Sequence, residues 1–208
     1  MAQFAFFFDG TRCNGCKTCV MSCKDLHDLP AERSFGRVYE YEKTSGWTVD
    51  ENGFNIPGEI YGYFVSLSCN HCDSPACVAA CPTGACMKDE ESGVVSIDEE
   101  ICIGSGECVT ACPYFAPSLN EETNKGEKCD GCAARVAEGM APMCVEACPQ
   151  RALTFGDASE VPEGFERANI APLPGMDGTM PNLYIKASKS AAKAGDTAGH
   201  VANLPETM

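Results

Sequence analysis

The sequence has few basic residues, few histidines and no long apolar run. Its 208 residues include 15 Lys and Arg against 30 Asp and Glu, which gives a net charge of −15 at pH 7. Nucleic acid and anionic lipid both require a basic surface, so neither is an expected partner. No apolar run approaches the roughly 18 residues of a membrane-spanning helix, and we expect no direct membrane span. With three histidines and no motif that places Ser, His and Asp together, we expect no catalysis by this chain alone.

The N-terminal residues also lack the pattern of an export signal. The aromatic run 4–8 follows Met1, Ala2 and Gln3, with no basic residue before it and no small-residue cleavage site after it. We therefore expect no secretory signal peptide. Two localisations stay open: the cytoplasm, or export in the folded state with a partner that carries a twin-arginine signal and membrane association through another subunit.

Cysteine, in contrast, is abundant. The chain has 16 cysteines, and its 44% hydrophobic share includes them, so we expect something besides apolar burial to stabilise the fold. Fifteen of them form four groups with related spacings. The groups are Cys13, Cys16, Cys19 and Cys23; Cys69, Cys72, Cys77 and Cys81; Cys102, Cys108 and Cys112; and Cys129, Cys132, Cys144 and Cys148.

The spacings distinguish between disulfides, zinc and iron–sulfur clusters. The first group reads C-x2-C-x2-C-x3-C, and each of the other three ends in C-x3-C-P. This run is typical of bacterial ferredoxins, in which the fourth Cys ligates the other cluster of a pair. Zinc or a redox dithiol explains one C-x2-C pair but not four copies with this ending. Cysteines this close share a metal more naturally than they form disulfides, so the pattern favours iron–sulfur ligation.

Two positions depart from this pattern. Ser105 stands where the third group would have its second Cys, and Cys86 lies outside every group. Ser105 is a candidate ligand through its oxygen, which is harder to deprotonate than a thiol. Cys86 is either a thiol packed as a small hydrophobe, which is the ordinary outcome, or a substitute ligand.

Other residues near the groups have two interpretations. His71 lies inside the second group and His27 follows the first, and each is interpreted as a surface residue or as a donor to sulfur. Basic side chains beside the groups either raise cluster potentials or are simply solvated, as most such residues are. They are Lys17, Lys24, Lys128 and Arg135.

The remaining sequence predicts short elements around these groups. Strands are expected over 2–9, 37–43, 61–68, 84–89, 94–98 and 152–157, with a short helix near the third Cys of each group. A polar loop is expected over 46–58. The stretch 158–208 has no Cys, and its spaced apolar residues favour an arm docked on a partner over disorder.

The four motifs, the insertion after the first and the long interval inside the fourth resemble one family. It is the four-cluster electron-transfer subunit of molybdopterin oxidoreductases of the dimethyl sulfoxide reductase type. The resemblance covers almost the whole chain. Besides the cysteine groups, the segments that carry it are 6–13, 16–19, 171–174, 181–182 and 195–199.

The resemblance implies an α+β fold of two intertwined bacterial-ferredoxin-like modules with pseudo-two-fold symmetry. Residues 1–30 and 125–157 would form the outer module and 60–120 the inner module, with a β-rich insertion at 31–59 and an extended C-terminal arm at 158–208.

It also implies four ligand sets, each drawn from two groups. Cluster 1 would take Cys13, Cys16, Cys19 and Cys148. Cluster 2 would take Cys69, Cys72, Cys77 and Cys112. Cluster 3 would take Cys81, Cys102 and Cys108, with Ser105 at the remaining corner. Cluster 4 would take Cys129, Cys132, Cys144 and Cys23.

The implied function is electron transfer without catalysis. The chain would relay single electrons to or from a large molybdopterin subunit, with a membrane anchor subunit as a further candidate partner; a free-standing polyferredoxin shuttle is the alternative. At least three clusters would be [4Fe-4S]. For the fourth, [3Fe-4S] is favoured, a Ser-ligated [4Fe-4S] form is a close second and recruitment of Cys86 a distant third. The terminal substrate and the electron donor are not encoded in these motifs.

Overall fold

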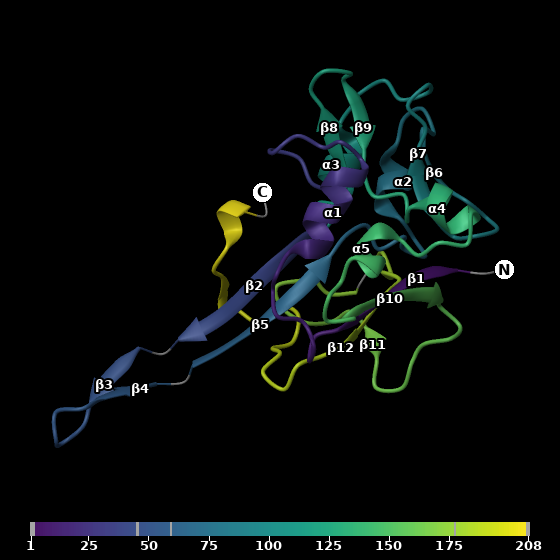
Figure 1. The fold of residues 1–208 in the computed structure, drawn as a ribbon. Helices are drawn as coiled ribbons and strands as arrows, with labels where there is room; N and C mark the ends of the chain where they lie inside the picture. The colour runs from purple at the N-terminus through teal and green to yellow at the C-terminus, as the bar shows by residue number, and fades with distance from the viewer. Residues whose placement is uncertain (1–2, 45, 59, 177, 207–208) are drawn as a thin grey trace.

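The aromatic N-terminal strand lies at the centre of the main sheet. The computed structural model describes residues 3–44, 46–58, 60–176 and 178–206. Strand β1 (Phe4–Asp9) pairs antiparallel with β10 (Leu153–Asp157) and parallel with β12 (Leu183–Lys186), and β12 pairs with β11 (Glu166–Arg167) (Figure 1). The predicted strands 2–9 and 152–157 are confirmed with shorter bounds, and residue 2 lies outside the described residues.

Both faces of β1 are buried because its side chains alternate between two apolar clusters. Phe4, Phe6 and Phe8 pack in the main core. Ala5 and Phe7 pack on the other face. The aromatic run therefore supplies two cores at once.

A second sheet is built from the insertion. Its order is β13 (His200–Val201), β2 (Arg37–Thr44) and β5 (Ile60–Leu67), and all its pairs are antiparallel. The predicted strands 37–43 and 61–68 are confirmed.

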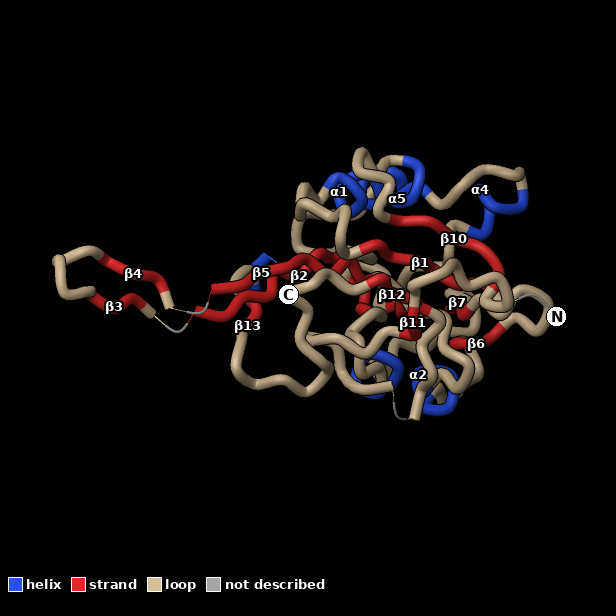
Figure 2. The backbone as a smooth tube through the Cα atoms, turned by 90° about the horizontal axis from the view of Figure 1, so that it is seen from below, coloured by secondary structure: helices blue, strands red, loops and turns tan. Residues whose placement is uncertain are grey.

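Beyond β2 and β5 the polypeptide projects from the body as a hairpin of β3 (Trp47–Val49) and β4 (Asn55–Pro57) (Figures 1 and 2). The expectation of a polar loop over 46–58 is wrong for these strands. Asp50 Oδ1 accepts hydrogen bonds from the Asn52 and Phe54 amides at 2.9 and 2.8 Å. This turn brings the two short β-forming stretches into register, which a count of polar residues does not reveal.

In the described part of the chain, five short α-helices surround the cysteines. They are α1 (Thr18–Leu26), α2 (Ala76–Ala80), α3 (Glu107–Ala111), α4 (Ala133–Ala137) and α5 (Met143–Glu146). Four of them contain the cysteine near which a helix is predicted: Cys19 in α1, Cys77 in α2, Cys108 in α3 and Cys144 in α5. Helix α4 is not predicted from the sequence. Helix α1 packs against α5, and α2 packs against α3. Helices of four or five residues are not stable alone, so these depend on their packing.

Two further hairpins flank the helices. They are β6 (Cys86–Lys88) with β7 (Val95–Ile97), and β8 (Ser118–Asn120) with β9 (Lys125–Glu127). The predicted strands 84–89 and 94–98 are confirmed with shorter bounds. The protein thus has few helices and several small sheets, which is the predicted α+β class.

The segment after β10 runs over the protein's own sheets. It supplies β11, β12 and β13 and ends in a 3-10 turn, Leu204–Glu206. Leu173, Leu183 and Ile185 are buried in the main core. The Asn182 side chain also holds the second cysteine group, donating to the His71 carbonyl oxygen at 2.9 Å. Docking of 158–208 on a partner stays a prediction. The apolar side chains Leu173, Leu183 and Ile185 already pack in the core of this protein. In the described residues, every helix is too short or too polar to cross a bilayer.

Candidate functional site

All sixteen cysteines are free thiols, so a disulfide framework does not hold this fold. The structure instead gathers cysteines around three cavities. One is lined by Cys13, Cys16, Cys19 and Cys148. Another is lined by Cys69, Cys72, Cys77 and Cys112. The third is lined by Cys19, Cys23, Cys129, Cys132 and Cys144. Each cavity therefore brings together cysteines that lie far apart in the sequence.

Helix geometry explains why one group serves two cavities. Cys19 and Cys23 are four residues apart on α1, so they lie on one helical face but one turn apart along the axis. Cys19 lines both the cavity of Cys13 and the cavity of Cys129, whereas Cys23 lines only the cavity of Cys129. Cys144 on the neighbouring α5 and Cys148 just after it divide in the same way. The packing of α1 on α5 thus interleaves the first and fourth groups.

Several thiols in these cavities are hard to ionise without a positive partner. Burial raises the pKa of Cys13 to about 11, and burial raises the pKa of Cys23 and Cys72 to about 12, with further increases from neighbouring cysteines. A thiolate is the form that binds a metal, and metal binding releases the proton. Closely spaced buried thiols with raised pKa values therefore fit iron, whose charge offsets theirs.

Backbone amides also point at the sulfurs. The Gly131 amide donates to Cys129 Sγ at 3.4 Å, and the Ala152 amide donates to Cys148 Sγ at 3.3 Å. Such donors stabilise negative charge on ligand sulfur and influence cluster potentials. The donor set is therefore that of iron–sulfur sites.

The third group is more open. Cys108 is buried and interacts with Cys81 and Cys102. The Gly126 amide donates to Cys102 Sγ at 3.3 Å, and a Cβ at this glycine would lie 3.6 Å from Cys108 Sγ. Ser105 is exposed, and its hydroxyl accepts from the Glu107 amide at 3.5 Å. The structure thus brings three thiols together and places the serine in the surrounding surface loop.

Cys86 lies between the second and third groups. It is 1% exposed and packs in a small core cluster with Cys77, Val95 and Cys108. A hydrogen bond with Cys77 raises the pKa of the Cys86 thiol, and its backbone amide donates to Cys81 Sγ at 3.3 Å. The packed-thiol interpretation fits this burial, and its role as a ligand stays a prediction.

Two polar side chains among the cysteines are buried, so the interpretation of His71 as a surface residue and of Lys128 as a solvated one is wrong. His71 is 1% exposed and Lys128 is 6% exposed. Burial alone raises the pKa of Cys69, but interactions with His71 and Lys128 outweigh it and lower that pKa to about 5. Sequence reasoning placed both residues near clusters but had no signal for their burial, which depends on packing between β1, β7 and the fourth group.

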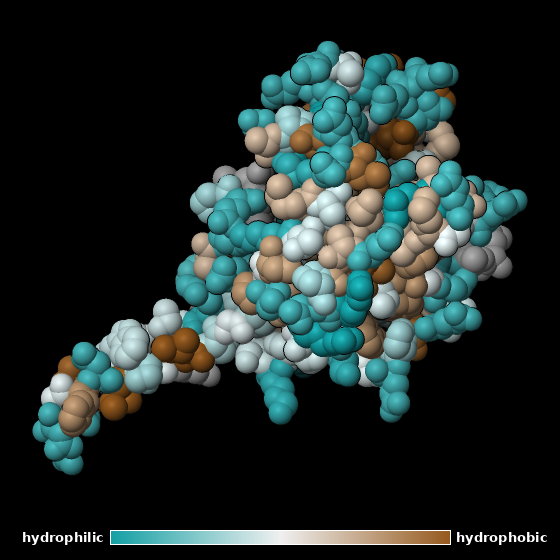
Figure 3. All heavy atoms as spheres, viewed as in Figure 1, coloured by the Kyte–Doolittle hydropathy of each residue, from teal (hydrophilic) through white to brown (hydrophobic). Residues whose placement is uncertain are grey.

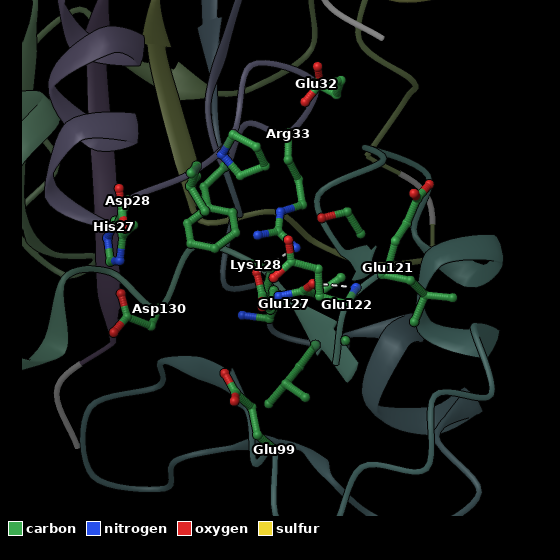
Figure 4. A pocket seen from close by; sticks show the side chains of 18 of the residues that line it. His27, Asp28, Glu32, Arg33, Glu99, Glu121, Glu122, Glu127, Lys128 and Asp130 are labelled. Atoms are coloured by element: carbon green, nitrogen blue, oxygen red, sulfur yellow. Dashed lines mark hydrogen bonds and ion pairs between the residues drawn. The ribbon is translucent and has the colours of Figure 1, made fainter. Parts of the chain in front are cut away.

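A large groove lies beside the third and fourth groups. Its volume is about 1160 Å³, and Figure 4 shows the carboxylates around it. Glu127 is engaged within the protein, since it accepts from Asn120 Nδ2 at 2.6 Å and lies 3.3 Å from the Arg33 guanidinium. At one end, ligand atoms of His27, Asp130 and Cys132 lie within 4.8 Å of one another. Because Cys132 belongs to the fourth cysteine group, this trio is the edge of that site rather than a separate one.

Comparison with known proteins gives matches over this whole arrangement. A model of a 4Fe-4S dicluster domain matches residues 60–158, and a model of a 4Fe-4S binding domain matches residues 11–33. The sequence is 47% identical over 205 residues, 98% of each protein, to the B subunit of anaerobic dimethyl sulfoxide reductase from Escherichia coli (strain K12). It is 47% identical over 208 residues to the same subunit of Haemophilus influenzae (strain ATCC 51907 / DSM 11121 / KW20 / Rd), covering 99% of this protein and 100% of that one. It is 40% identical over 162 residues to the thiosulfate reductase electron transfer subunit of Salmonella typhi, covering 76% and 79%.

Proposed function

Because the protein belongs to the family of iron–sulfur subunits of dimethyl sulfoxide reductase-type enzymes, we propose that it relays single electrons to or from a molybdopterin catalytic subunit. The observation that carries this function is the set of three cavities, each lined by at least four cysteines drawn from two sequence groups. The protein itself is a non-catalytic subunit of the complex. A free-standing shuttle is not favoured, because the similarity to reductase subunits extends over nearly the full length.

We propose the four ligand sets in the pairing expected from the sequence, first group with fourth and second with third. Three sets coincide with the cysteines that line the three cavities, apart from Cys19, which lines two of them. When bound there, iron–sulfur clusters supply the one-electron carriers. The packing of α1 on α5 and of α2 on α3 supports the same pairing and the two intertwined modules, 1–30 with 125–157 and 60–120.

For the third set we propose a [3Fe-4S] cluster. Cys81, Cys102 and Cys108 supply three thiolates, and the exposed Ser105 offers only a poorly acidic hydroxyl at the fourth corner. An iron without a protein thiolate is the one most easily lost. A Ser-ligated [4Fe-4S] cluster is the second candidate, and Cys86 as the fourth ligand is the third.

The contact with the catalytic subunit is proposed to involve the insertion and the C-terminal segment. The projecting β3–β4 hairpin exposes apolar side chains, seen as brown atoms on the extension in Figure 3. Trp47 is 65% exposed and Phe54 is 67% exposed. Apolar side chains held in solvent by a structured hairpin are typical of an interaction site. A membrane anchor subunit is proposed as the second partner.

Purification of the tagged protein from its native cells tests the function. We expect a large molybdenum-containing subunit to co-purify and the preparation to be brown. The double variant Trp47→Ser, Phe54→Ser should lose the large subunit while keeping its iron, because both side chains lie far from the cysteines along an extended hairpin. The matched control Met21→Ser, at a side chain 62% exposed on α1, should keep the partner. Isolation of the wild-type protein alone, with full iron content, would support the shuttle instead.

A further inference from the structure

His71 is fixed at the junction of several segments. It is 1% exposed, and its ring lies edge-on to Phe4 with centroids 5.3 Å apart. Its carbonyl oxygen accepts from the side-chain amides of Gln3 and Asn182, at 3.3 and 2.9 Å. These contacts come from both ends of the chain. The imidazole is therefore held in one orientation by groups outside its own loop.

That orientation determines where the ring proton lies. The Val95 amide donates to His71 Nδ1 at 3.0 Å, so Nδ1 is an acceptor and the neutral ring carries its proton on Nε2. Nε2 is buried and has no hydrogen-bond partner of normal geometry among the described residues. The imidazole interacts with the sulfurs of Cys69 and Cys129. Nε2 lies beside Gly131, where a Cβ would be 3.6 Å from it, and the Gly131 amide itself donates to Cys129 Sγ. A buried donor without a partner costs free energy, so a donor in this position indicates an acceptor in the loaded protein.

Lys128 supplies a second donor at the same place. It is 6% exposed, and its ammonium donates to the carbonyl oxygens of Val95 and Cys129, the latter at 2.9 Å. The thiolates with which its charge interacts most strongly are those of Cys69 and Cys129. The Val95 backbone thus orients both side chains, one through its N–H and the other through its C=O.

Cys69 and Cys129 belong to different cavities and to different modules of the proposed relay. On the basis of that proposed function, we propose that His71 and Lys128 bridge clusters 2 and 4, with His71 Nε2–H donating to the ligand sulfurs of Cys69 and Cys129. An N–H donor and a buried positive charge both stabilise the reduced cluster, which carries one more negative charge. The bridge therefore raises both reduction potentials. With clusters bound, one electron would leave one cluster and enter the other, and His71 would keep its proton on Nε2 throughout.

His71 acts here as a positioning residue, and reduction potentials test it. In the intact complex, His71→Leu should lower the reduced-to-oxidised ratio of clusters 2 and 4 at a fixed potential by about tenfold, equivalent to about 59 mV for a one-electron couple. His71→Gln, which keeps an N–H donor, should recover most of this ratio. His200→Leu makes the same chemical change at an exposed side chain on β13 and should alter neither cluster. Potentiometric titration followed by EPR measures all three variants.

A measurement on the unmutated complex covers the case in which His71→Leu does not fold. With ¹⁵N-histidine labelling, pulsed EPR of the reduced complex should show a nitrogen coupling from His71, identified as the coupling that disappears in the His71→Gln complex while any coupling from His27 stays. If clusters form with unchanged potentials in His71→Leu, or if the His71→Gln complex loses no nitrogen coupling, the bridge is wrong while the relay stands. If the wild-type complex forms no clusters, the proposed function itself fails.

Discussion

The second and third cysteine sets differ in how completely the protein encloses them. Around the second set, Cys69 and Cys112 are buried, and His71 and Lys128 lie beside Cys69 in the interior. Around the third set, Cys81 and Cys102 are half-buried and Ser105 is exposed. The same ferredoxin-like spacing is therefore used once inside the molecule and once at its surface.

This difference separates two tasks that the repeated motif performs. A buried set joins segments that are remote in the sequence and so contributes to folding as well as to electron transfer. An exposed set with an incomplete ring of thiols can change its iron content without rearranging the core. We infer that the relay is least variable at the centre and most adjustable at the third set.

The largest effect is expected from removal of iron, which should leave the third set first and the buried sets later. An anaerobic chelator should first bleach the signal of the third set with little loss of structure. Loss of iron from the buried sets should then abolish most of the native circular dichroism, because these sites join segments that are remote in the sequence, such as those of Cys69 and Cys112 in the second set. Circular dichroism and EPR recorded through one titration follow both events. An iron-free protein with native circular dichroism would show that apolar packing alone maintains the fold.

The next effect concerns the missing thiolate. Ser105→Cys should complete the third set and convert the proposed [3Fe-4S] cluster to [4Fe-4S]. The EPR signal of the air-oxidised protein should therefore disappear, while the reduced protein gains a signal. Thr110→Cys, on the outer face of α3, adds a thiol away from the corner and should leave the oxidised signal unchanged. A wild type without an oxidised signal would instead indicate that Ser105 or Cys86 holds a fourth iron.

Removal of the buried Lys128 ammonium beside the second set should have a smaller but measurable effect on the free energy of unfolding. Lys128→Met removes the hydrogen bonds to Val95 and Cys129 and leaves their carbonyl oxygens without this donor. We expect the free energy of unfolding to fall by about 1–3 kcal/mol. The control Lys189→Met lies at an exposed position and should change it little. Anaerobic denaturation of the two loaded variants provides the comparison, and equal stabilities would contradict the structural role of Lys128.

The smallest effect is expected at Cys86, which lies between the two sets. Cys86→Ala removes one buried sulfur and should cost about 1 kcal/mol of unfolding free energy with iron content unchanged. The same substitution at Cys77 should also remove iron from the second set. Iron analysis of the two variants separates packing from ligation, and iron loss in Cys86→Ala would make Cys86 a ligand.

Much of this organisation follows from local sequence patterns. The spacing of Cys19 and Cys23, and of Cys144 and Cys148, predicts their helices because four residues make about one helical turn. The aromatic, apolar run 4–8 likewise predicts a strand. The hairpin at 46–58 does not follow from polarity alone, although Asp50 and Gly53 are typical turn residues.

Long-range packing sets the remaining features. The burial of Lys128 depends on the carbonyl oxygen of Val95, which lies 33 residues away. The place of the described residues after β10 depends on the pairing of β12 with β1, which is remote in the sequence. No local pattern specifies such partners, and a lysine beside a cysteine is usually solvated. The donors around the sites are therefore recognisable only in the folded protein.

The iron and acid-labile sulfide content of the anaerobically purified complex tests the central claim most directly. Three [4Fe-4S] clusters and one [3Fe-4S] cluster require about 15 iron atoms per copy of this subunit. A value near this number, with sulfide to match, is the predicted result. A value of about 8 or fewer in a fully folded protein, or zinc in place of iron, would contradict a four-cluster relay.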